Sequence, residues 1–389
     1  MKAINQLKTF QRILGEYPAE TPLSKFLPGF YRQNKQMGSS DRRIANRLMY
    51  NYFRLGKALW NTPTDDRLMV AEFLCNTQVN SFLQHFKPDW AACVNFTIEE
   101  KIDLVIKTYP DFKLEDVFPW SNQISAGINK TEFLKSFFCQ PDLFIHVHNG
   151  YDHLVKAELT KAAITFKDEG NGCLALPNGT RLEAIFTNQH WFEVQDHSSQ
   201  QTADYFKPAK WDAWWDACAA SGGKSLLLHE LEPNIKLVVS DIRESILANL
   251  DERFRSAGLL KYQKKQLDLT QNVDQTLHDY EFDGIILDAP CSGSGTWGRT
   301  PEMIAQFEPQ KIEFFQRLQK TIAANVIKFL KPGKPLIYIT CSAFKAENEE
   351  VVDYLVKECG LKLEEVKVLK GYENKADTMF VARLSPPAL

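Results

Sequence analysis

Two apolar segments in the C-terminal part of the chain, each followed closely by a cysteine, most constrain what this sequence can fold into. Residues 282–287 precede Asp288-Ala289-Pro290-Cys291-Ser292-Gly293, and residues 335–339 precede Thr340-Cys341-Ser342. Short apolar runs of this kind are typical of buried parallel strands. Residues 309–331 carry apolar side chains at helical spacing, so we predict two neighbouring strands joined by a helical crossover.

Asp288, Cys291 and Cys341 all follow the ends of these predicted strands. In an open α/β sheet, ligands bind in the crevice outside the carboxyl ends of the strands, so we expect the three residues in one pocket. The alternative interpretation is a pair of buried structural cysteines, a common role for isolated thiols. Their placement after two strands favours a chemical site.

Strands and helices alternate through the rest of the C-terminal part. This pattern predicts a Rossmann-like α/β domain over residues 196–389. The predicted strands are 211–217, 235–240, 265–267, 361–369 and 379–384, and the predicted helices are 225–229, 243–256 and 351–358.

The N-terminal part, residues 1–129, shows helical patterns and is predicted to form an all-helical domain. Residues 42–61 place apolar side chains three or four positions apart after Ser39-Ser40-Asp41, a typical helix start. Further helices are predicted at 65–76, 79–85 and 98–108. Residues 1–60 carry eleven Lys or Arg and three Asp or Glu, a charge of +8, which leaves −11 for the rest of a chain of net charge −3. A cationic end suits a polyanion such as RNA, but a solvated helical face would have the same composition.

Residues 130–195 mix both patterns and are predicted to form a small α+β module. The predicted elements are a strand at 143–147, a helix at 154–163 and a strand at 173–176. His146, His148 and His153 invite a metal interpretation, but no Cys or carboxylate stands at ligand spacing, so we expect no metal site.

The eight cysteines are scattered without a CxxC pair, which favours reduced thiols over a disulfide framework. We found no signal sequence and no apolar run long enough to span a bilayer. We therefore expect a soluble, cytoplasmic monomer that does not insert into a membrane.

A turn rich in small residues, Cys218 to Ser225, follows the strand predicted at 211–217. Gly222 and Gly223 would let backbone N–H groups approach a ligand closely. The end of this turn, Gly223-Lys224-Ser225, resembles the end of a phosphate-binding P-loop, but that motif requires Gly where the chain has Cys218. This departure argues against a nucleotide hydrolase.

Three acids, Asp241, Asp268 and Asp288, stand at the ends of successive predicted strands. Each alone could be a loop or helix cap. Together they suit a ligand that contains adenosine and a cation, such as S-adenosylmethionine (SAM), because Asp241 could bind ribose hydroxyls and Asp268 the adenine amino group.

Four segments resemble the signature blocks of the SAM-dependent RNA cytosine-5 methyltransferases of the RsmB/Nop/Sun group. They are Phe192 to Gln200, Cys218 to Lys224, Asp288 to Gly293 and Thr340 to Ser342. Ser40-Asp41-Arg42-Arg43 also resembles the start of the NusB-type RNA-binding domain of the RsmB branch. The sequence departs from the group at Ser221, where Pro is usual, and at Thr296 to Glu302, where two adjacent basic residues are common.

The resemblance implies that Cys341 is the nucleophile and that Cys291 assists release of the product. It also implies a SAM site formed by the turn and the strand-end acids, namely Cys218, Ala219, Ala220, Ser221, Gly222, Gly223, Lys224, Asp241, Asp268 and Asp288. The chemistry makes the same demand, because C5 of cytosine attacks a methyl donor only after a thiolate has added at C6. Asp288 would stabilise protonation at N3 of the ring.

DNA cytosine methyltransferases use the Pro-Cys thiol as nucleophile, so the second cysteine in Thr340-Cys341-Ser342 favours RNA. The resemblance of the N-terminal domain points to ribosomal RNA as the substrate. Transfer RNA is the alternative substrate. A non-catalytic RNA-binding assembly factor with the same fold is a further alternative, although such a protein would have little need of both cysteines.

Overall fold

The computed structural model describes residues 2–388, which divide into two compact units. The helical unit comprises the chain up to Asn122 together with Asn129–Gln140 and Thr296–Glu308. The sheet unit comprises Gln123–Ile128, Pro141–Gly295 and the chain from Pro309 onward. Neither unit is therefore one continuous stretch of sequence.

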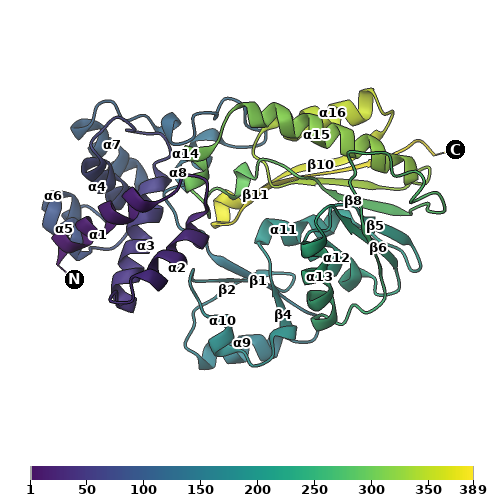
Figure 1. Cartoon of the computed structure of the whole chain (residues 1–389), viewed down its shortest axis with the longest axis horizontal. Helices are drawn as coiled ribbons and strands as arrows, with labels where there is room; N and C mark the ends of the chain where they lie inside the picture. Colours follow the sequence, from purple (N-terminus) through teal and green to yellow (C-terminus); the bar gives the residue numbers. More distant parts are fainter. Residues whose placement is uncertain (1, 389) are drawn as a thin grey trace. The chain divides into compact units, whose positions relative to one another are not determined.

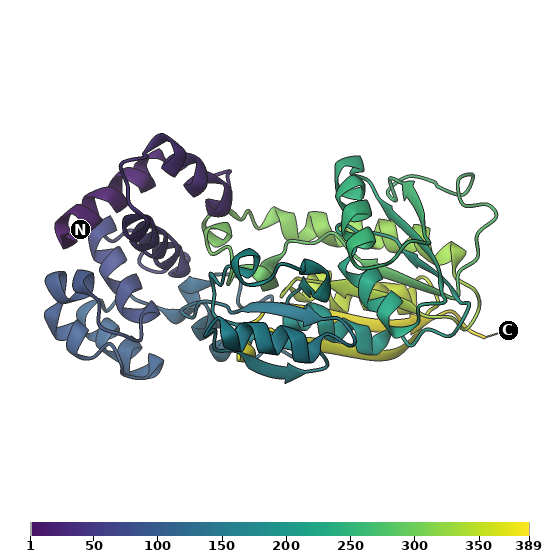
Figure 2. The same ribbon diagram turned by 90° about the horizontal axis from the view of Figure 1, so that it is seen from below.

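The helical unit buries aromatic and aliphatic side chains between its helices, including Phe10, Leu27, Leu48, Phe53 and Leu68. Figure 2 shows the purple and blue segments of the chain as helices and loops, which confirms the prediction of a helical N-terminal region. Its elements are α1 Ala3–Glu16, α2 Leu23–Gln33, α3 Ser39–Arg54, α4 Thr64–Cys75, α5 Ser81–Phe86, α6 Pro88–Ala92, α7 Ile98–Thr108, η1 Leu114–Val117, α8 Lys130–Ser136 and α14 Glu302–Gln306.

The helix predicted at 42–61 was too long, since α3 ends at Arg54. Gly56, two residues further on, has a left-handed backbone with φ of +55°, a conformation that commonly terminates helices. A Cβ at this position would lie 1.8 Å from the carbonyl oxygen of Val117. Only glycine allows this close approach, so the chain leaves the helical conformation just before Gly56.

Arg54 attaches the separate chain segments of the helical unit to α3. The side chain is 1% exposed, and its Nη1 donates to the carbonyl oxygens of Phe137 at 3.0 Å, Cys139 at 3.1 Å and Gly298 at 2.9 Å. Trp297 packs in the same unit, with ring centroids 5.5 Å from Phe118. The segment Thr296 to Glu302, which departs from the family pattern, is thus part of the helical unit.

The sheet unit is built on a seven-stranded sheet of strand order β10-β11-β9-β8-β5-β6-β7. Strands β8 and β9 are parallel neighbours with Ile286 opposite Ile337, as predicted. Strand β11 runs antiparallel to β9, and β10 runs antiparallel to β11. The bounds are β5 Ala213–Asp216, β6 Lys236–Asp241, β7 Gln263–Gln266, β8 Gly284–Asp288, β9 Leu336–Thr340, β10 Lys362–Lys370 and β11 Thr378–Ser385.

Helices cover both faces of this sheet, and Figure 1 shows α15 and α16 on one side with α12 and α13 on the other. Ile285 and Leu287 of β8 pack against α15 and α16, whereas Ile286 between them packs against α12 and α13. Alternate residues of a strand face opposite sides, so a strand covered on both sides is apolar throughout. The helices are α12 Gly223–Leu231, α13 Glu244–Ser256, α15 Gln310–Val326 and α16 Glu349–Lys357.

A smaller, four-stranded antiparallel sheet of order β2-β3-β1-β4 also belongs to the sheet unit. Its core joins Ile145, Leu174 and Phe192 to Val155 and Leu159 of the helix α9. The elements are β1 Leu143–Val147, α9 Asp152–Lys161, β2 Lys167–Gly170, β3 Cys173–Leu176, α10 Leu182–Ile185, β4 Phe192–Val194 and α11 His197–Gln201.

Across residues 2–388, no helix is both long enough and apolar enough to cross a membrane.

Candidate active site

A cavity of 460 Å³ lies at the carboxyl ends of β5, β6, β8 and β9. Seven of the predicted site residues line it, namely Cys218, Ala220, Asp241, Asp268, Asp288, Cys291 and Cys341. The other predicted residues, Ala219, Ser221, Gly222, Gly223 and Lys224, are not among its lining residues. Leu318 and Ile322 of α15 add an apolar wall that the sequence did not suggest.

The turn between β5 and α12 has the backbone that its glycines predicted. Gly222 has φ of +84°, and a Cβ there would lie 2.2 Å from the ring of Phe254. The amide N–H of Ala220 donates to Asp241 Oδ2 over 3.1 Å, which ties the turn to the end of β6. The turn therefore brings Cys218 and Ala220 to the cavity while Gly222 packs against α13.

Asp241 is held by Arg243, a residue that the sequence analysis missed. Arg243 donates through its backbone N–H and its Nε to Asp241 Oδ1, at 2.9 and 3.0 Å, and through Nη2 to Oδ2 at 3.2 Å. Burial opposes ionisation of Asp241, but the hydrogen bonds from Arg243 outweigh it and lower the pKa. The carboxylate is therefore charged at neutral pH.

Asp268 and Asp288 complete the acidic side of the cavity. The strand β7 ends at Gln266, one residue before the predicted end at 267, so Asp268 lies in the loop that follows. Asp268 Oδ1 accepts from the N–H of Thr270 at 3.0 Å and from the Thr270 hydroxyl at 2.6 Å. Asp288 ends β8, and its Oδ2 lies 3.0 Å from Lys224 Nζ. Lys224 thus acts on the cavity through Asp288.

Asp216 is a further acid near the cavity, and it was hidden inside the strand predicted at 211–217. It is 0% exposed, and its Oδ2 accepts a hydrogen bond from Ser225 Oγ at 2.7 Å, while its Oδ1 has no partner among residues 2–388. Burial, the largest effect, raises the pKa of Asp216 to about 7. Asp216 could have been recognised in the sequence as an acid inside an otherwise apolar strand.

The two thiols meet at the cavity. Cys291 Sγ lies 3.3 Å from Cys341 Sγ, a distance that suits an S–H···S contact and exceeds the 2.0 Å or so of a disulfide. The contact with Cys341 and burial both raise the pKa of Cys291 well above that of an ordinary thiol. Cys291 therefore keeps its proton and can donate it toward the sulfur of Cys341.

Glu347 fixes the two loops that carry these thiols. Its Oε2 accepts from the backbone N–H of Ser292 at 2.8 Å and from Gln319 Nε2 at 3.0 Å, and its Oε1 accepts from Ser342 Oγ at 2.7 Å. Ser292 and Ser342 directly follow the two cysteines in the sequence. Glu347 is 0% exposed, and burial raises its pKa. Glu347 gave no signal in the sequence, since an acid in a polar loop has no periodicity.

The part of the chain that carries this cavity is similar to a known protein family. Residues 203–388 match the family model described as 16S rRNA methyltransferase RsmB/F. This part of the chain is therefore similar to the RsmB/F methyltransferases. The match confirms the resemblance drawn from the cysteine and glycine segments.

Curated relatives match a stretch of similar length. Ribosomal RNA small subunit methyltransferase B of Shewanella oneidensis is 36% identical over 176 residues, which cover 44% of this chain and 40% of the relative. The probable protein of that name from Bacillus subtilis is 31% identical over 183 residues, 46% of this chain and 41% of the relative. The chain thus matches about two fifths of the length of these relatives.

Solved structures extend the likeness of fold beyond the RsmB/F region. The crystal structure of PH0851 superposes with a TM-score of 0.70 at 19% identity and covers 96% of each chain. NSun6 from Pyrococcus horikoshii, solved with SFG, gives a TM-score of 0.59 at 17% identity and covers 69% of this chain and 96% of its own. The predicted Rossmann-like fold is confirmed.

The histidines of β1 and the loop after it contact a carboxylate in the structure. His146 Nε2 lies 2.7 Å from Glu230 Oε2 on α12, and His148 Nδ1 lies 3.7 Å from the same oxygen. Within residues 2–388, no group of three or more His, Cys, Asp or Glu is arranged to hold a metal ion.

Proposed function

We propose that this chain is a SAM-dependent RNA cytosine-5 methyltransferase whose substrate is ribosomal RNA. The observation that carries the proposal is the pair of thiols, Cys291 and Cys341, 3.3 Å apart in a cavity that three carboxylates also line. The family description and the names of the curated relatives support ribosomal RNA as the substrate class.

The cavity suits SAM in size and in chemistry. Its 460 Å³ lies within the roughly 300–1,000 Å³ of small-molecule sites. SAM supplies a methyl group on a positively charged sulfur, and carboxylates attract that charge. In this proposal Asp241 binds the ribose hydroxyls, Asp268 the adenine amino group, and Asp288 lies toward the cationic end. Cys218 and Ala220 contact the ligand, and Ala219, Ser221, Gly222, Gly223 and Lys224 shape the turn around it.

Cys341 acts as the nucleophile in this proposal. Its thiolate adds to C6 of the target cytosine and forms a C–S bond, which turns the ring into an enamine that is nucleophilic at C5. Because Cys291 keeps its own proton and donates toward the neighbouring sulfur, it stabilises negative charge on Cys341. Asp288 stabilises the proton at N3 of the ring, and Lys224 keeps this carboxylate in place at 3.0 Å.

Release of the product requires removal of a proton from C5. After C5 has gained the methyl group, a base takes this proton, the C6–S bond breaks and the electron pair returns to Cys341. A water that Cys291 orders is the candidate base, because the Cys291 thiol keeps its own proton and its sulfur lies 3.3 Å from Cys341. Cys291 itself could take the C5 proton only after it had lost its own proton to solvent. The net change is one methyl gained and one proton lost at C5.

The target base must leave its stack to reach a cavity at the ends of the strands. This favours a loop or an incompletely assembled RNA as the substrate. A ribosomal RNA substrate would place the protein in the cytoplasm, and we expect it to act as a monomer without a metal.

The first test replaces the proposed nucleophile. Cys341→Ala should reduce methyl transfer from radiolabelled SAM to ribosomal RNA to background, because no adduct at C6 can form. The dissociation constant for SAM, measured by calorimetry, should stay within about twofold of that of the unmodified protein. Full activity in this variant would refute the role of Cys341.

The second test replaces Cys291, the residue proposed to assist release of the product. Cys291→Ala should trap the methylated adduct, since Cys341 can attack but the C5 proton is not removed. The expected result is a protein–RNA band of reduced mobility on a denaturing gel, which Cys291→Ala/Cys341→Ala should lack. The absence of that band from Cys291→Ala with bound RNA would contradict the release role.

A further inference from the structure

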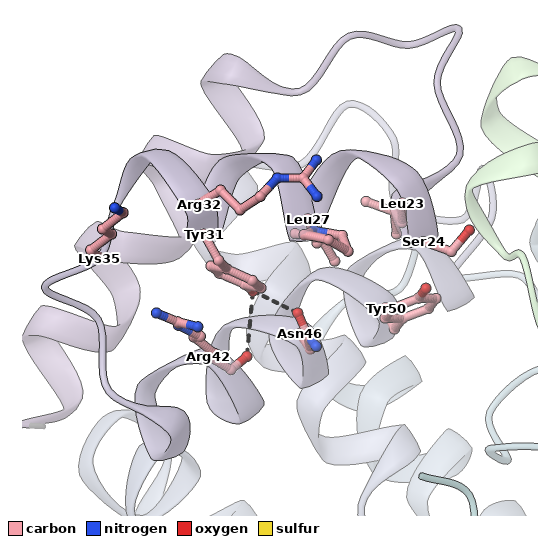
Figure 3. A pocket seen from close by; sticks show the side chains of 10 residues that line it. Leu23, Ser24, Leu27, Tyr31, Arg32, Lys35, Arg42, Asn46 and Tyr50 are labelled. Atoms are coloured by element: carbon pink, nitrogen blue, oxygen red, sulfur yellow. Dashed lines mark hydrogen bonds between the residues drawn. The ribbon is translucent and has the colours of Figure 1, made fainter. Parts of the chain in front are cut away.

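The helical unit contains a second pocket, of 520 Å³, between α2 and α3 (Figure 3). Tyr31 and Arg32 come from α2, Lys35 from the loop that follows it, and Arg42 and Tyr50 from α3. Leu27 adds an apolar wall. The pocket is therefore built by two helices of one unit and is unrelated to the cavity lined by the cysteines.

Positive charge dominates this pocket. Its lining residues include Arg32, Lys35 and Arg42 but no Asp or Glu. Among residues 2–388, Arg32, Lys35 and Arg42 have no carboxylate partner. Arg42 Nε donates to the carbonyl of Met37 at 2.9 Å, and its guanidinium lies over the ring of Tyr31. Figure 3 shows Lys35 and Arg42 toward the same end of the pocket. These cations are available for an anion.

The opposite end of the pocket offers a phenol and apolar surface. Figure 3 shows Tyr50 there, beside Leu23 and Ser24. The Tyr50 hydroxyl has no hydrogen-bond partner among the described residues, and burial, with Glu302 nearby, raises its pKa to about 12, so it stays protonated. Glu302 does not line the pocket, and its Oε1 accepts from the N–H of Leu23 at 2.9 Å.

Planar groups line the middle of the pocket. The guanidinium of Arg42 lies over the ring of Tyr31, 5.7 Å from its centroid, and the Tyr31 hydroxyl donates to Asn46 Oδ1 at 2.5 Å. RNA bases stack on aromatic rings and on arginine planes, and their edges bind amides and hydroxyls. The order of groups from cations to planar groups to phenol matches a phosphate followed by a base.

We propose that this pocket binds one unstacked nucleotide of single-stranded RNA. Its phosphate lies at Lys35 and Arg42, its base lies toward Tyr50, and Arg32, whose guanidinium is near Leu27 in Figure 3, adds positive charge above the middle of the pocket. A base that is paired in a duplex cannot enter a pocket of this kind. The inference rests on the proposed function, since an RNA methyltransferase meets its substrate as RNA, and it adds a second contact outside the methyl-transfer cavity.

The test compares two double variants that remove the same charge from the same unit. Arg32→Ala/Lys35→Ala removes two pocket cations, whereas Lys25→Ala/Arg43→Ala removes two exposed cations of α2 and α3 that do not line the pocket. The probe is a fluorescent 12-nucleotide single-stranded RNA, titrated at several salt concentrations. Weakening the contact with one phosphate should lower the slope of log affinity against log salt by up to about 0.7. The affinity should fall by roughly tenfold or more.

Tyr50→Phe provides an independent measurement with an intact helix packing. It should weaken binding of the same RNA by roughly threefold to tenfold, through loss of one hydrogen bond, and leave the salt slope unchanged. Equal affinity and slope in the two double variants would overturn the inference. Competition by an oligoglutamate peptide as strong as competition by unlabelled RNA would also overturn it, because the site would then select charge alone.

If the proposed function is wrong, the methyl-transfer assay shows it separately from the RNA-binding measurement. In that case the unmodified chain would not transfer methyl groups to RNA, whatever its affinity for the oligonucleotide. The pocket variants should keep the SAM affinity of the unmodified chain, because Arg32, Lys35 and Tyr50 do not line the cavity at the strand ends.

Discussion

Asp216 shows at the scale of a single residue how burial sets chemistry. It belongs to β5, between two faces of packed helices, and one of its oxygens has no hydrogen-bond partner among the described residues. An ionised carboxylate is costly there, which is why the pKa of Asp216 rises to about 7. The folded chain keeps this proton over a pH range in which the unfolded chain has already lost it.

This linkage predicts that Asp216→Asn stabilises the protein at high pH. From about pH 4 to pH 7 the folded state binds more protons than the unfolded state, so stability of the unmodified chain falls as pH rises through that window. A neutral Asn can still accept from Ser225 and does not ionise. By urea unfolding, the variant should exceed the unmodified protein by roughly 4 kcal/mol at pH 8.

At pH 4 the two proteins should differ little, and Asp279→Asn, at an exposed side chain, should change stability little at either pH. A gain for Asp216→Asn that is the same at pH 4 and pH 8 would contradict the account.

At the scale of elements, the strands β8 and β9 were predicted well because both faces of the sheet are covered. Burial on both sides makes the strand sequence continuously apolar, and that signal is local. The end of α3 was predicted badly, since it depends on Gly56 meeting the carbonyl of Val117, which is far away in the sequence. The helical spacing of apolar residues continues past Arg54, so the predicted end of the helix was too late.

The loops after β8 and β9 depend on one buried carboxylate, so we predict that Glu347→Gln impairs catalysis. The amide cannot accept from Ser292, Gln319 and Ser342 together, and one loop loses its anchor. A lost buried hydrogen bond of about 1–3 kcal/mol would lower kcat by roughly tenfold to a hundredfold if it displaces a thiol.

The KM for SAM should change little, because Glu347 does not line the cavity. Glu350→Gln, an exposed neighbour on α16, is the matched control and should keep full kcat. An unchanged kcat in Glu347→Gln, or an equal loss in both variants, would show that Glu347 does not position the thiols.

At the scale of the whole molecule, each unit is assembled from separate stretches of the chain. The helical unit takes in Asn129–Gln140 and Thr296–Glu308, and Arg54 binds carbonyl groups from both stretches. The segment Thr296 to Glu302, which departs from the pattern of the RsmB/Nop/Sun group, therefore contributes to the packing of the helical unit. Trp297 and Glu302 pack within the helical unit, with Glu302 accepting from Leu23.

We therefore predict that Arg54→Met loosens these two stretches selectively. The carbonyls of Phe137, Cys139 and Gly298 would lose their donor inside the protein, at a cost of roughly 3 kcal/mol or more. Hydrogen exchange should accelerate in Asn129–Gln140 and Thr296–Glu308 and stay unchanged in the seven-stranded sheet. Arg43→Met, at an exposed position of α3, should have no such effect. Uniform acceleration throughout the chain would contradict the prediction.

The sequence by itself determined the features that arise from neighbouring residues. These are the buried strands before Asp288 and Thr340, the glycine turn before α12, the helical N-terminal region, and the cysteines and acids that follow strand ends. Their signals are periodicity, turn chemistry and the rule that parallel strands present their carboxyl ends at one edge.

Only the tertiary structure decided how distant side chains meet. It paired Cys291 with Cys341 at 3.3 Å, Lys224 with Asp288 at 3.0 Å, and Glu347 with the loops after both thiols. It also formed the cationic pocket between α2 and α3. The physical reason is that hydrogen bonds, ion pairs and desolvation depend on distance in space, and a sequence read alone records only distance along the chain.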